Sequence, residues 1–180
     1  MPVFNRAGWL AAVARVVSPN HDARPRDVAI DLLVIHAISL PPGTFGGPGI
    51  EQLFTNRLDP AGHPDYREIA GLRVSSHFLI RRDGSLVQFV PCGRRAWHAG
   101  VSVWQGRERC NDFSIGVELE GTDERPFEDA QYAQLTALTQ ALRRRYPLGD
   151  LVGHSDIAPG RKTDPGPCFD WARYRNTLAG

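Results

Sequence analysis

Short apolar runs bounded by turn residues are the feature that most constrains the fold of this chain. The runs are rich in Val, Ile, Leu and Phe, a composition that favours β-strands over surface helices. None approaches the roughly 18 consecutive apolar residues that a membrane span requires. The sequence therefore predicts several short strands, of which the clearest cover residues 32–36, 77–81, 86–90 and 115–119.

One pair of these runs predicts a β-hairpin. The segments HFLIRR and SLVQFV flank the dipeptide Asp83-Gly84. Such a dipeptide favours the positive φ angles of a two-residue hairpin turn. We therefore expect the strands at 77–81 and 86–90 to pair in antiparallel fashion.

Two segments predict helices. The first runs from about Asp129 to Tyr146, where apolar residues recur at spacings of three and four and Pro147 stops the helix. The second runs from Asp170, a candidate N-cap, to Leu178. Strands mixed with helices predict a single-domain α/β (α+β) fold with a central mixed β-sheet flanked by helices. The apolar stripe of the first helix consists of Tyr132, Leu135, Leu138, Leu142 and Tyr146, and that of the second of Trp171, Tyr174 and Leu178.

The composition indicates one soluble globular domain covering residues 1–180. Hydrophobic residues make up 42 % of the chain and charged residues 23 %, and the net charge is +1. That balance argues against nucleic acid as a partner, and we interpret Arg143–Arg145 as cations at a helix C-terminus instead of a binding patch. The first residues, MPVFNRAGWL, lack the features of a signal peptide, so we expect a cytoplasmic protein that does not bind a membrane.

The three cysteines, Cys92, Cys110 and Cys168, are far apart and form no C-x-x-C pair. Neither a disulfide framework nor a cysteine zinc site is indicated. None has a histidine beside it in sequence, so packing is the favoured interpretation over nucleophilic catalysis.

The segment from Ala37 to Tyr66 differs from the rest of the chain. It is rich in Gly and Pro and predicts at most short helices. Because it lacks a long periodic apolar run, we expect low local stability. A lid or substrate wall is favoured over a passive surface loop.

Two histidines follow apolar runs and are candidate metal ligands. His36 ends LLVIH, and His154 ends LVGH and opens HSDIAPGRKTDPGP, which also supplies Lys162 and Asp164. Two imidazoles and one carboxylate match a catalytic zinc site that leaves one position for water. From the residues alone, Asp164 as a turn cap and Lys162 as a solvated side chain are equally good interpretations.

The run SIGVELEG holds two candidate proton carriers. Alternation puts Ile115, Val117 and Leu119 on one face of a strand and Glu118 and Glu120 on the other. The second face can be solvent-exposed, or it can present a general base. Periodicity does not choose between the two glutamates, because they share a face.

Four stretches together resemble one known family. They are VIHAISLPPGTFGGPGI, LRVSSHFLIRRDGSLVQFVPC, RRAWHAGVSVWQGRERCNDFSIGVELEGTD and VGHSDIAPGRKTDPGPCFDWAR. They are similar to the cytoplasmic 1,6-anhydro-N-acetylmuramyl-L-alanine amidases, which belong to the zinc amidases that include T7 lysozyme and the peptidoglycan recognition proteins. The resemblance covers nearly the whole chain and implies their fold.

The resemblance also implies roles for individual residues. It makes His36, His154 and Asp164 the ligands of one Zn²⁺ per chain, Glu118 the general base and Lys162 the group that stabilises the oxyanion. More loosely, it places a substrate groove along Arg73, Trp97, His98 and Arg109, although the apolar face of Trp97 can equally pack in the core. His77 is expected to pack or to support the site. Many members have Asn after the first ligand where this chain has Ala37, which puts substrate affinity or lid geometry in question.

The implied substrate is a small molecule, an anhydromuramyl peptide from wall recycling, with no obligate protein partner. The competing hypothesis is a non-catalytic peptidoglycan receptor on the same fold, which is disfavoured because the implied site is complete. A structural zinc is disfavoured because only three ligands are found. A secreted autolysin is disfavoured by the N-terminal sequence.

Overall fold

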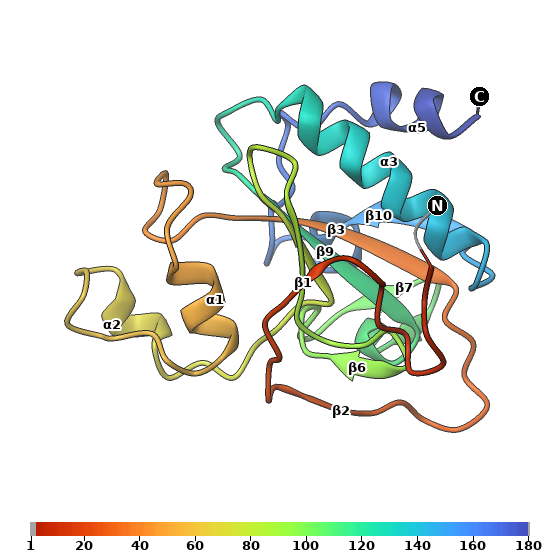
Figure 1. Ribbon diagram of the computed structural model, residues 1–180, viewed down its shortest axis with the longest axis horizontal. Coiled ribbons are helices and arrows are strands. Elements are labelled where there is room, and N and C mark those ends of the chain that lie inside the picture. Colours follow the sequence, from red (N-terminus) through yellow and green to blue (C-terminus); the bar gives the residue numbers. More distant parts are fainter. Residues whose placement is uncertain (1–2, 180) are drawn as a thin grey trace.

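A six-stranded mixed sheet forms the centre of the computed structural model, which describes residues 3–179. The strand order is β1-β5-β4-β9-β3-β10, and every neighbouring pair is parallel except β4 with β5 (Figure 1). The predicted mixed sheet is therefore confirmed. The strands are β1 (Ala14–Arg15), β3 (Leu32–Ile38), β4 (Phe78–Ile80), β5 (Leu86–Gln88), β9 (Ser114–Glu120) and β10 (Asp150–Gly153).

Two small sheets were not predicted. Strand β2 (His21–Ala23) pairs with β6 (Arg94–Ala96), and β7 (Val103–Trp104) pairs with β8 (Arg107–Glu108). Their strands are two or three residues long and mostly polar. Because such strands carry no period-two apolar pattern, the sequence gives no local signal for them.

The predicted hairpin is present, but its turn differs. Strands β4 and β5 pair with Phe78 opposite Gln88 and Ile80 opposite Leu86. The amide of Arg81 donates to the carbonyl of Ser85 over 2.9 Å, and the amide of Gly84 donates to the carbonyl of Arg81 over 2.9 Å. The connection is thus a three-residue loop, in which only Gly84 (φ 83°) has positive φ, and the predicted two-residue turn is wrong.

Both predicted helices are present. Helix α3 (Asp129–Arg143) begins where expected but ends three residues before Tyr146. Helix α5 (Trp171–Ala179) begins after Asp170, whose carboxylate accepts a 2.8 Å hydrogen bond from the amide of Arg173, as an N-cap does. Within residues 3–179, no helix has the length and apolarity needed to cross a bilayer. The remaining helices are α1 (Gly49–Phe54), α2 (Tyr66–Ile69), the 3₁₀ helix η1 (Cys110–Asp112) and α4 (His154–Ile157).

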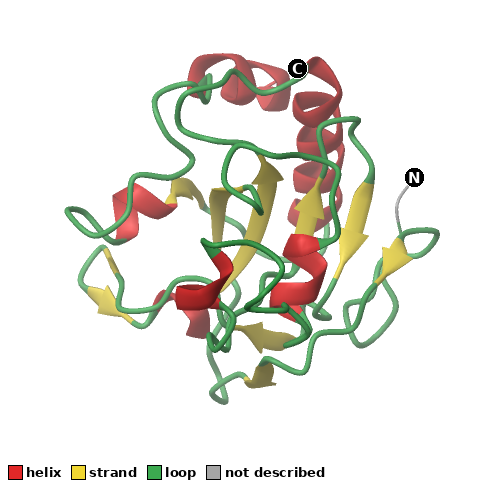
Figure 2. Cartoon of the chain, turned by 90° about the vertical axis from the view of Figure 1, so that its left-hand side faces the viewer, coloured by secondary structure: helices red, strands yellow, loops and turns green. Residues whose placement is uncertain are grey.

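The two faces of the sheet are covered differently. Helices α3 and α5 pack over one face, and α1 and α2, at the left of Figure 1 and nearest the viewer in Figure 2, lie apart from them. The main core joins alternate residues of β3, β4 and β9 to the stripe of α3. On the other face lie two smaller clusters, one built on Leu79 and Val87 and one on Leu32 and Val34. The residues of β3 and β9 between these clusters are therefore free to line a site.

The Gly/Pro-rich segment is more firmly packed than its sequence suggests. Its buried residues form one cluster with β4, β5 and the chain that follows β5. Full burial of each such side chain contributes about 1.5–3 kcal/mol, which argues against the low local stability expected from the sequence. Its movement on substrate binding stays a prediction. The buried apolar residues of the segment are Leu40, Ile50, Leu53, Phe54, Leu58 and Tyr66.

Replacing Gly49 with alanine tests this packing. A Cβ atom there would lie 2.6 Å from the carbonyl oxygen of Leu40 and 2.7 Å from the hydroxyl of Tyr66. We expect Gly49→Ala to lower the free energy of unfolding by about 1–3 kcal/mol in urea titrations, as overpacking does. Gly47→Ala is the control, because its Cβ would have no neighbour closer than 3.9 Å. Equal stability of the two variants would contradict the packing described here.

Candidate active site

A pocket of about 220 Å³ opens on the sheet face opposite α3. One side is polar and carries histidine, carboxylate and lysine side chains from β3, β9 and the chain after β10. The other side is apolar and comes from α1 and the chain around Val74. The pocket is lined by His36, Ala37, Ile38, Leu53, Phe54, Leu72, Val74, Ser75, Trp97, His98, Glu118, His154, Lys162 and Asp164.

Three of these side chains each place one potential metal-ligand atom close to the other two. His36 lies in β3, His154 is the first residue of α4, and Asp164 lies in the loop that follows. The Nδ1 atoms of His36 and His154 are 3.0 Å apart, and Oδ2 of Asp164 lies 3.2 Å and 3.1 Å from them. This near-equilateral triangle of donor atoms is the arrangement that one face of a tetrahedral metal site requires.

The Nε2 atoms of His36 and His154 have partners outside the triangle, so the Nδ1 atoms are the ones that can point a lone pair at its centre. Nε2 of His154 lies 3.1 Å from the carbonyl oxygen of Ala99, which only accepts, so Nε2 carries a proton and Nδ1 is the ring nitrogen that can bind a metal. Burial lowers the pKa of His36 to about 4, so this ring is neutral at pH 7. Burial raises the pKa of Asp164, but hydrogen bonds that a protonated Nδ1 of His154 or His36 donates to its carboxylate hold the pKa below the ordinary value.

The chemistry of this donor set fits a divalent cation. Two imidazole nitrogens and a carboxylate oxygen, each able to offer a lone pair, lie within 3.2 Å of one another. Without a cation, these atoms repel one another, and a proton can bridge only one pair at a time. Zinc is bound by this set of ligand types in catalytic sites.

Glu118 lies beside the triangle. In the parallel register of β3 and β9 it is the partner of His36. Its side chain is buried, and burial together with the charge of Asp164 raises its pKa well above the ordinary value, while Lys162 opposes the shift. Within residues 3–179, the Glu118 carboxylate receives no hydrogen bond from a side chain or from the backbone, so it is available to a ligand in the pocket.

Glu120 lies on the same face of β9 but is engaged elsewhere. Its carboxylate accepts hydrogen bonds from the amide of Gly46 over 2.7 Å and from the amide of Arg82 over 3.2 Å. It also pairs with Arg81 over 3.1 Å. Glu120 therefore ties the Gly/Pro-rich segment and the hairpin to the sheet, and it does not line the pocket.

The other residues singled out in the sequence divide into two groups. Lys162, Trp97 and His98 line the pocket, and His98 is in addition packed against His36, with ring centroids 5.0 Å apart. Arg73 is exposed and does not line the pocket, although its neighbours in sequence do. Arg109 lies outside it, with a side chain that is 76 % exposed and pairs with Asp112 over 3.2 Å.

Several lining residues had no individual signal in the sequence. Ile38, Leu53, Phe54 and Val74 form the apolar side of the pocket. The first three lie in the Ala37–Tyr66 segment, for which a substrate wall was favoured, but they look like ordinary core residues in sequence. Val74 lies outside that segment, and only tertiary packing brings it to the site.

His77 lies behind the pocket, as expected of a packed or supporting residue. It is fully buried, its Nδ1 accepts from the amide of Gly116 over 3.1 Å, and its Nε2 donates to the carbonyl oxygen of Arg94 over 3.1 Å. These contacts satisfy both ring nitrogens without a metal.

The cysteines are free and none lines the pocket. Burial raises the pKa of Cys92 to about 12, so this thiol stays protonated at neutral pH. A cysteine nucleophile therefore has no support.

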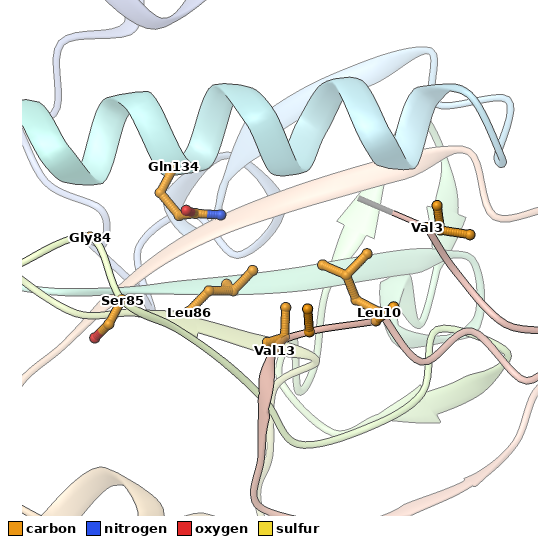
Figure 3. Close-up of a pocket in the computed structure, with 9 residues that line it drawn as sticks. Val3, Leu10, Val13, Gly84, Ser85, Leu86 and Gln134 are labelled. Carbon is orange, nitrogen blue, oxygen red and sulfur yellow. The ribbon is translucent and has the colours of Figure 1, made fainter. Parts of the chain in front are cut away.

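A larger hollow of about 500 Å³ lies between the N-terminal segment, the hairpin turn and α3 (Figure 3). Its lining is mostly apolar and carries no ionisable side chain. Unlike the pocket above, it offers no group for catalysis. Its lining residues are Val3, Leu10, Ala11, Ala12, Val13, Gly84, Ser85, Leu86 and Gln134.

Known proteins are similar to this chain in sequence and fold. Residues 26–167 match the family model described as N-acetylmuramoyl-L-alanine amidase. The 1,6-anhydro-N-acetylmuramyl-L-alanine amidase AmpD of Escherichia coli K12 is 64 % identical over 170 residues, which cover 93 % of each chain. A crystal structure of a selenomethionine derivative of AmpD superimposes with a TM-score of 0.95 at 61 % identity, covering 98 % of this chain and 99 % of that one.

A more distant solved structure is the N-acetylmuramyl-L-alanine amidase AmiD from E. coli. It has a TM-score of 0.62 and 28 % identity, and the match covers 97 % of this chain and 65 % of that chain. The matched family region spans all the strands from β3 to β10 and every residue that lines the pocket. The chain belongs to the N-acetylmuramoyl-L-alanine amidase family.

Proposed function

We propose that this enzyme uses zinc to hydrolyse the amide bond between the lactyl group of 1,6-anhydro-N-acetylmuramic acid and the L-alanine of a stem peptide. The observation that carries the proposal is the triangle of His36, His154 and Asp164 beside the buried Glu118. The AmiD structure is a complex with anhydro-N-acetylmuramic acid-L-Ala-D-γ-Glu-L-Lys, which supports this class of substrate. We take the whole chain, residues 1–180, as one amidase domain.

The zinc would be held by Nδ1 of His36, Nδ1 of His154 and Oδ2 of Asp164. When bound, it supplies Lewis acidity and lowers the pKa of water to about 7. The protein itself supplies the proton transfers. Glu118, with its raised pKa and free carboxylate, would take a proton from the attacking water and deliver it to the alanine nitrogen as the amide bond breaks.

Lys162 is the cation on the polar side of the pocket. We propose that its ammonium group donates a hydrogen bond to the carbonyl oxygen as negative charge develops there. Loss of one such donor typically costs about 10²–10³ in rate. Its position two residues before Asp164 couples the location of this charge to the metal-binding loop.

The apolar side of the pocket suits the stem peptide and the sugar ring. Trp97 can stack on either, and we keep Arg73 and Arg109 as residues that could meet the outer parts of a longer substrate. Both arginines lie outside the pocket that surrounds the triangle, so their contribution would be to affinity and not to the chemical step.

We further propose that the enzyme acts in the cytoplasm on recycled wall fragments. This follows the family resemblance of the sequence and the names of the relatives at 64 % and 51 % identity, which specify the anhydro sugar. Its activity would keep β-lactamase-inducing muropeptides low.

The metal proposal predicts one zinc per chain. Dialysis against a chelator should abolish activity, and added zinc should restore it, because the attacking water then regains its activating cation. His36→Ala, His154→Ala and Asp164→Ala should each lower zinc content and activity. Metal analysis and turnover of an anhydromuramyl peptide measure both. Full activity of metal-free protein would contradict the proposal.

The two glutamates predict different defects. Glu118→Ala should retain zinc and lose about 10²–10⁴ in kcat, because general-base catalysis is removed. Glu120→Gln should leave kcat near that of the unsubstituted enzyme and lower the unfolding midpoint, because the ion pair with Arg81 is weakened. Steady-state kinetics and thermal melts distinguish them. A larger loss of kcat in Glu120→Gln would overturn the assignment of the base.

The substrate proposal predicts a preference for soluble fragments. The names of the relatives at 64 % and 51 % identity specify the anhydro sugar, which supports a soluble fragment as substrate. Initial rates of peptide release should be higher from soluble anhydromuropeptide than from insoluble sacculi at equal concentrations of the scissile bond. Mass spectrometry of the products gives both rates. Faster release from sacculi would indicate a wall-degrading enzyme instead.

A further inference from the structure

The outer ring nitrogens of both metal-site histidines contact two consecutive residues. Nε2 of His36 lies 2.9 Å from Nδ1 of His98, and Nε2 of His154 lies 3.1 Å from the carbonyl oxygen of Ala99. His36 and His154 are 118 positions apart in the chain. One dipeptide thus contacts the back of both rings.

The contact on His36 continues to a second acceptor. Nε2 of His98 lies 3.2 Å from the hydroxyl oxygen of Ser114, and both residues are buried. When Nδ1 of His36 offers its lone pair to the triangle, its Nε2–H must donate to Nδ1 of His98. His98 then carries its own proton on Nε2 and donates to Ser114. Each ring thereby keeps the tautomer that a metal ligand needs.

The dipeptide is itself held by one side chain. Oδ1 of Asn111, in η1, accepts hydrogen bonds from the amide of His98 over 3.1 Å and from the amide of Ala99 over 2.8 Å. On the sheet side, a Cβ at Gly116 would lie 2.5 Å from Cγ of His98, so the imidazole rests directly on glycine backbone. Asn111 does not line the pocket and contacts neither metal-site histidine.

We propose that His98, Ala99 and Asn111 form a positioning platform that fixes the tautomer and orientation of His36 and His154. This inference rests on the proposed metal site. It changes the role expected of His98 from a residue that contacts substrate to one that acts through His36. It also gives a role to Asn111, which takes no part in the proposed chemical step.

The zinc affinity of a matched pair of variants tests the platform. Asn111→Leu removes the acceptor oxygen at similar size, whereas Asn111→Asp keeps it. Chelator competition should show zinc binding about 10–100-fold weaker in Asn111→Leu, the usual effect of losing such support, and near that of the unsubstituted enzyme in Asn111→Asp. The absorption spectrum of the cobalt(II)-substituted protein should change in Asn111→Leu only.

Three further variants separate the platform from general destabilisation and from a substrate contact. His98→Phe should weaken zinc binding to a similar extent, and Ser114→Ala, a milder change, should weaken it less. Thr139→Val removes a buried hydroxyl that contacts Tyr174 on the other side of the sheet, so it should lower the melting temperature of the metal-free protein without changing zinc affinity.

The outcomes distinguish the two proposals. If the unsubstituted enzyme binds no zinc, the metal site fails and the platform fails with it. If it binds zinc and Asn111→Leu, His98→Phe and Ser114→Ala bind zinc equally well, the platform alone is overturned. Unchanged zinc affinity with a raised KM in His98→Phe would make His98 a substrate contact and would also overturn the platform.

Discussion

The parallel register between β3 and β9 is the constraint on which the rest of the structure depends. It sets His36 opposite Glu118 and, on the alternate face, aligns Leu33 and Ile35 with the main core. Because side chains alternate between faces, a slip of one residue would turn His36 into the core under α3 and would expose apolar residues in the pocket. The apolar stripe of α3 therefore helps to fix the register that places His36 and Glu118 on the far side of the sheet, although none of its residues lines the pocket.

Local patterns of apolar residues explain what could be predicted from the sequence. Helices α3 and α5 carry periodic apolar patterns, and β3 and β4 are short apolar runs, so their type and approximate bounds follow from the residues. The two-stranded sheets depend on tertiary pairing of short polar segments. The hairpin loop around Gly84 has three residues instead of the predicted two, because Arg81 pairs with Ser85. The buried positions of the Gly/Pro-rich segment could not be predicted, because they are spaced irregularly between turns.

The residues that meet at the site were predicted from the sequence, but the partners of each residue were not. Convergence of His36, His154 and Asp164 followed from family resemblance, and their residue types alone left a turn cap as an equal interpretation of Asp164. Glu118 and Glu120 share a face, so periodicity could not separate them. Their environments do, because Arg81 and two backbone amides occupy Glu120 and leave Glu118 in the pocket. Such partners come from distant segments and leave no local trace in the sequence.

Charge balance links the metal triangle to Glu118. The pocket contains two carboxylates, Asp164 and Glu118, three imidazoles and one lysine, so its acidic groups outnumber its fixed cations. Burial and the charge of Asp164 both raise the pKa of Glu118, which favours a protonated group that cannot act as a base. A divalent cation on the triangle would oppose both effects, because it offsets the charge of Asp164 and attracts an ionised Glu118. The proposed cation and the proposed base would therefore depend on each other, because an ion that activated water would also make Glu118 able to accept its proton.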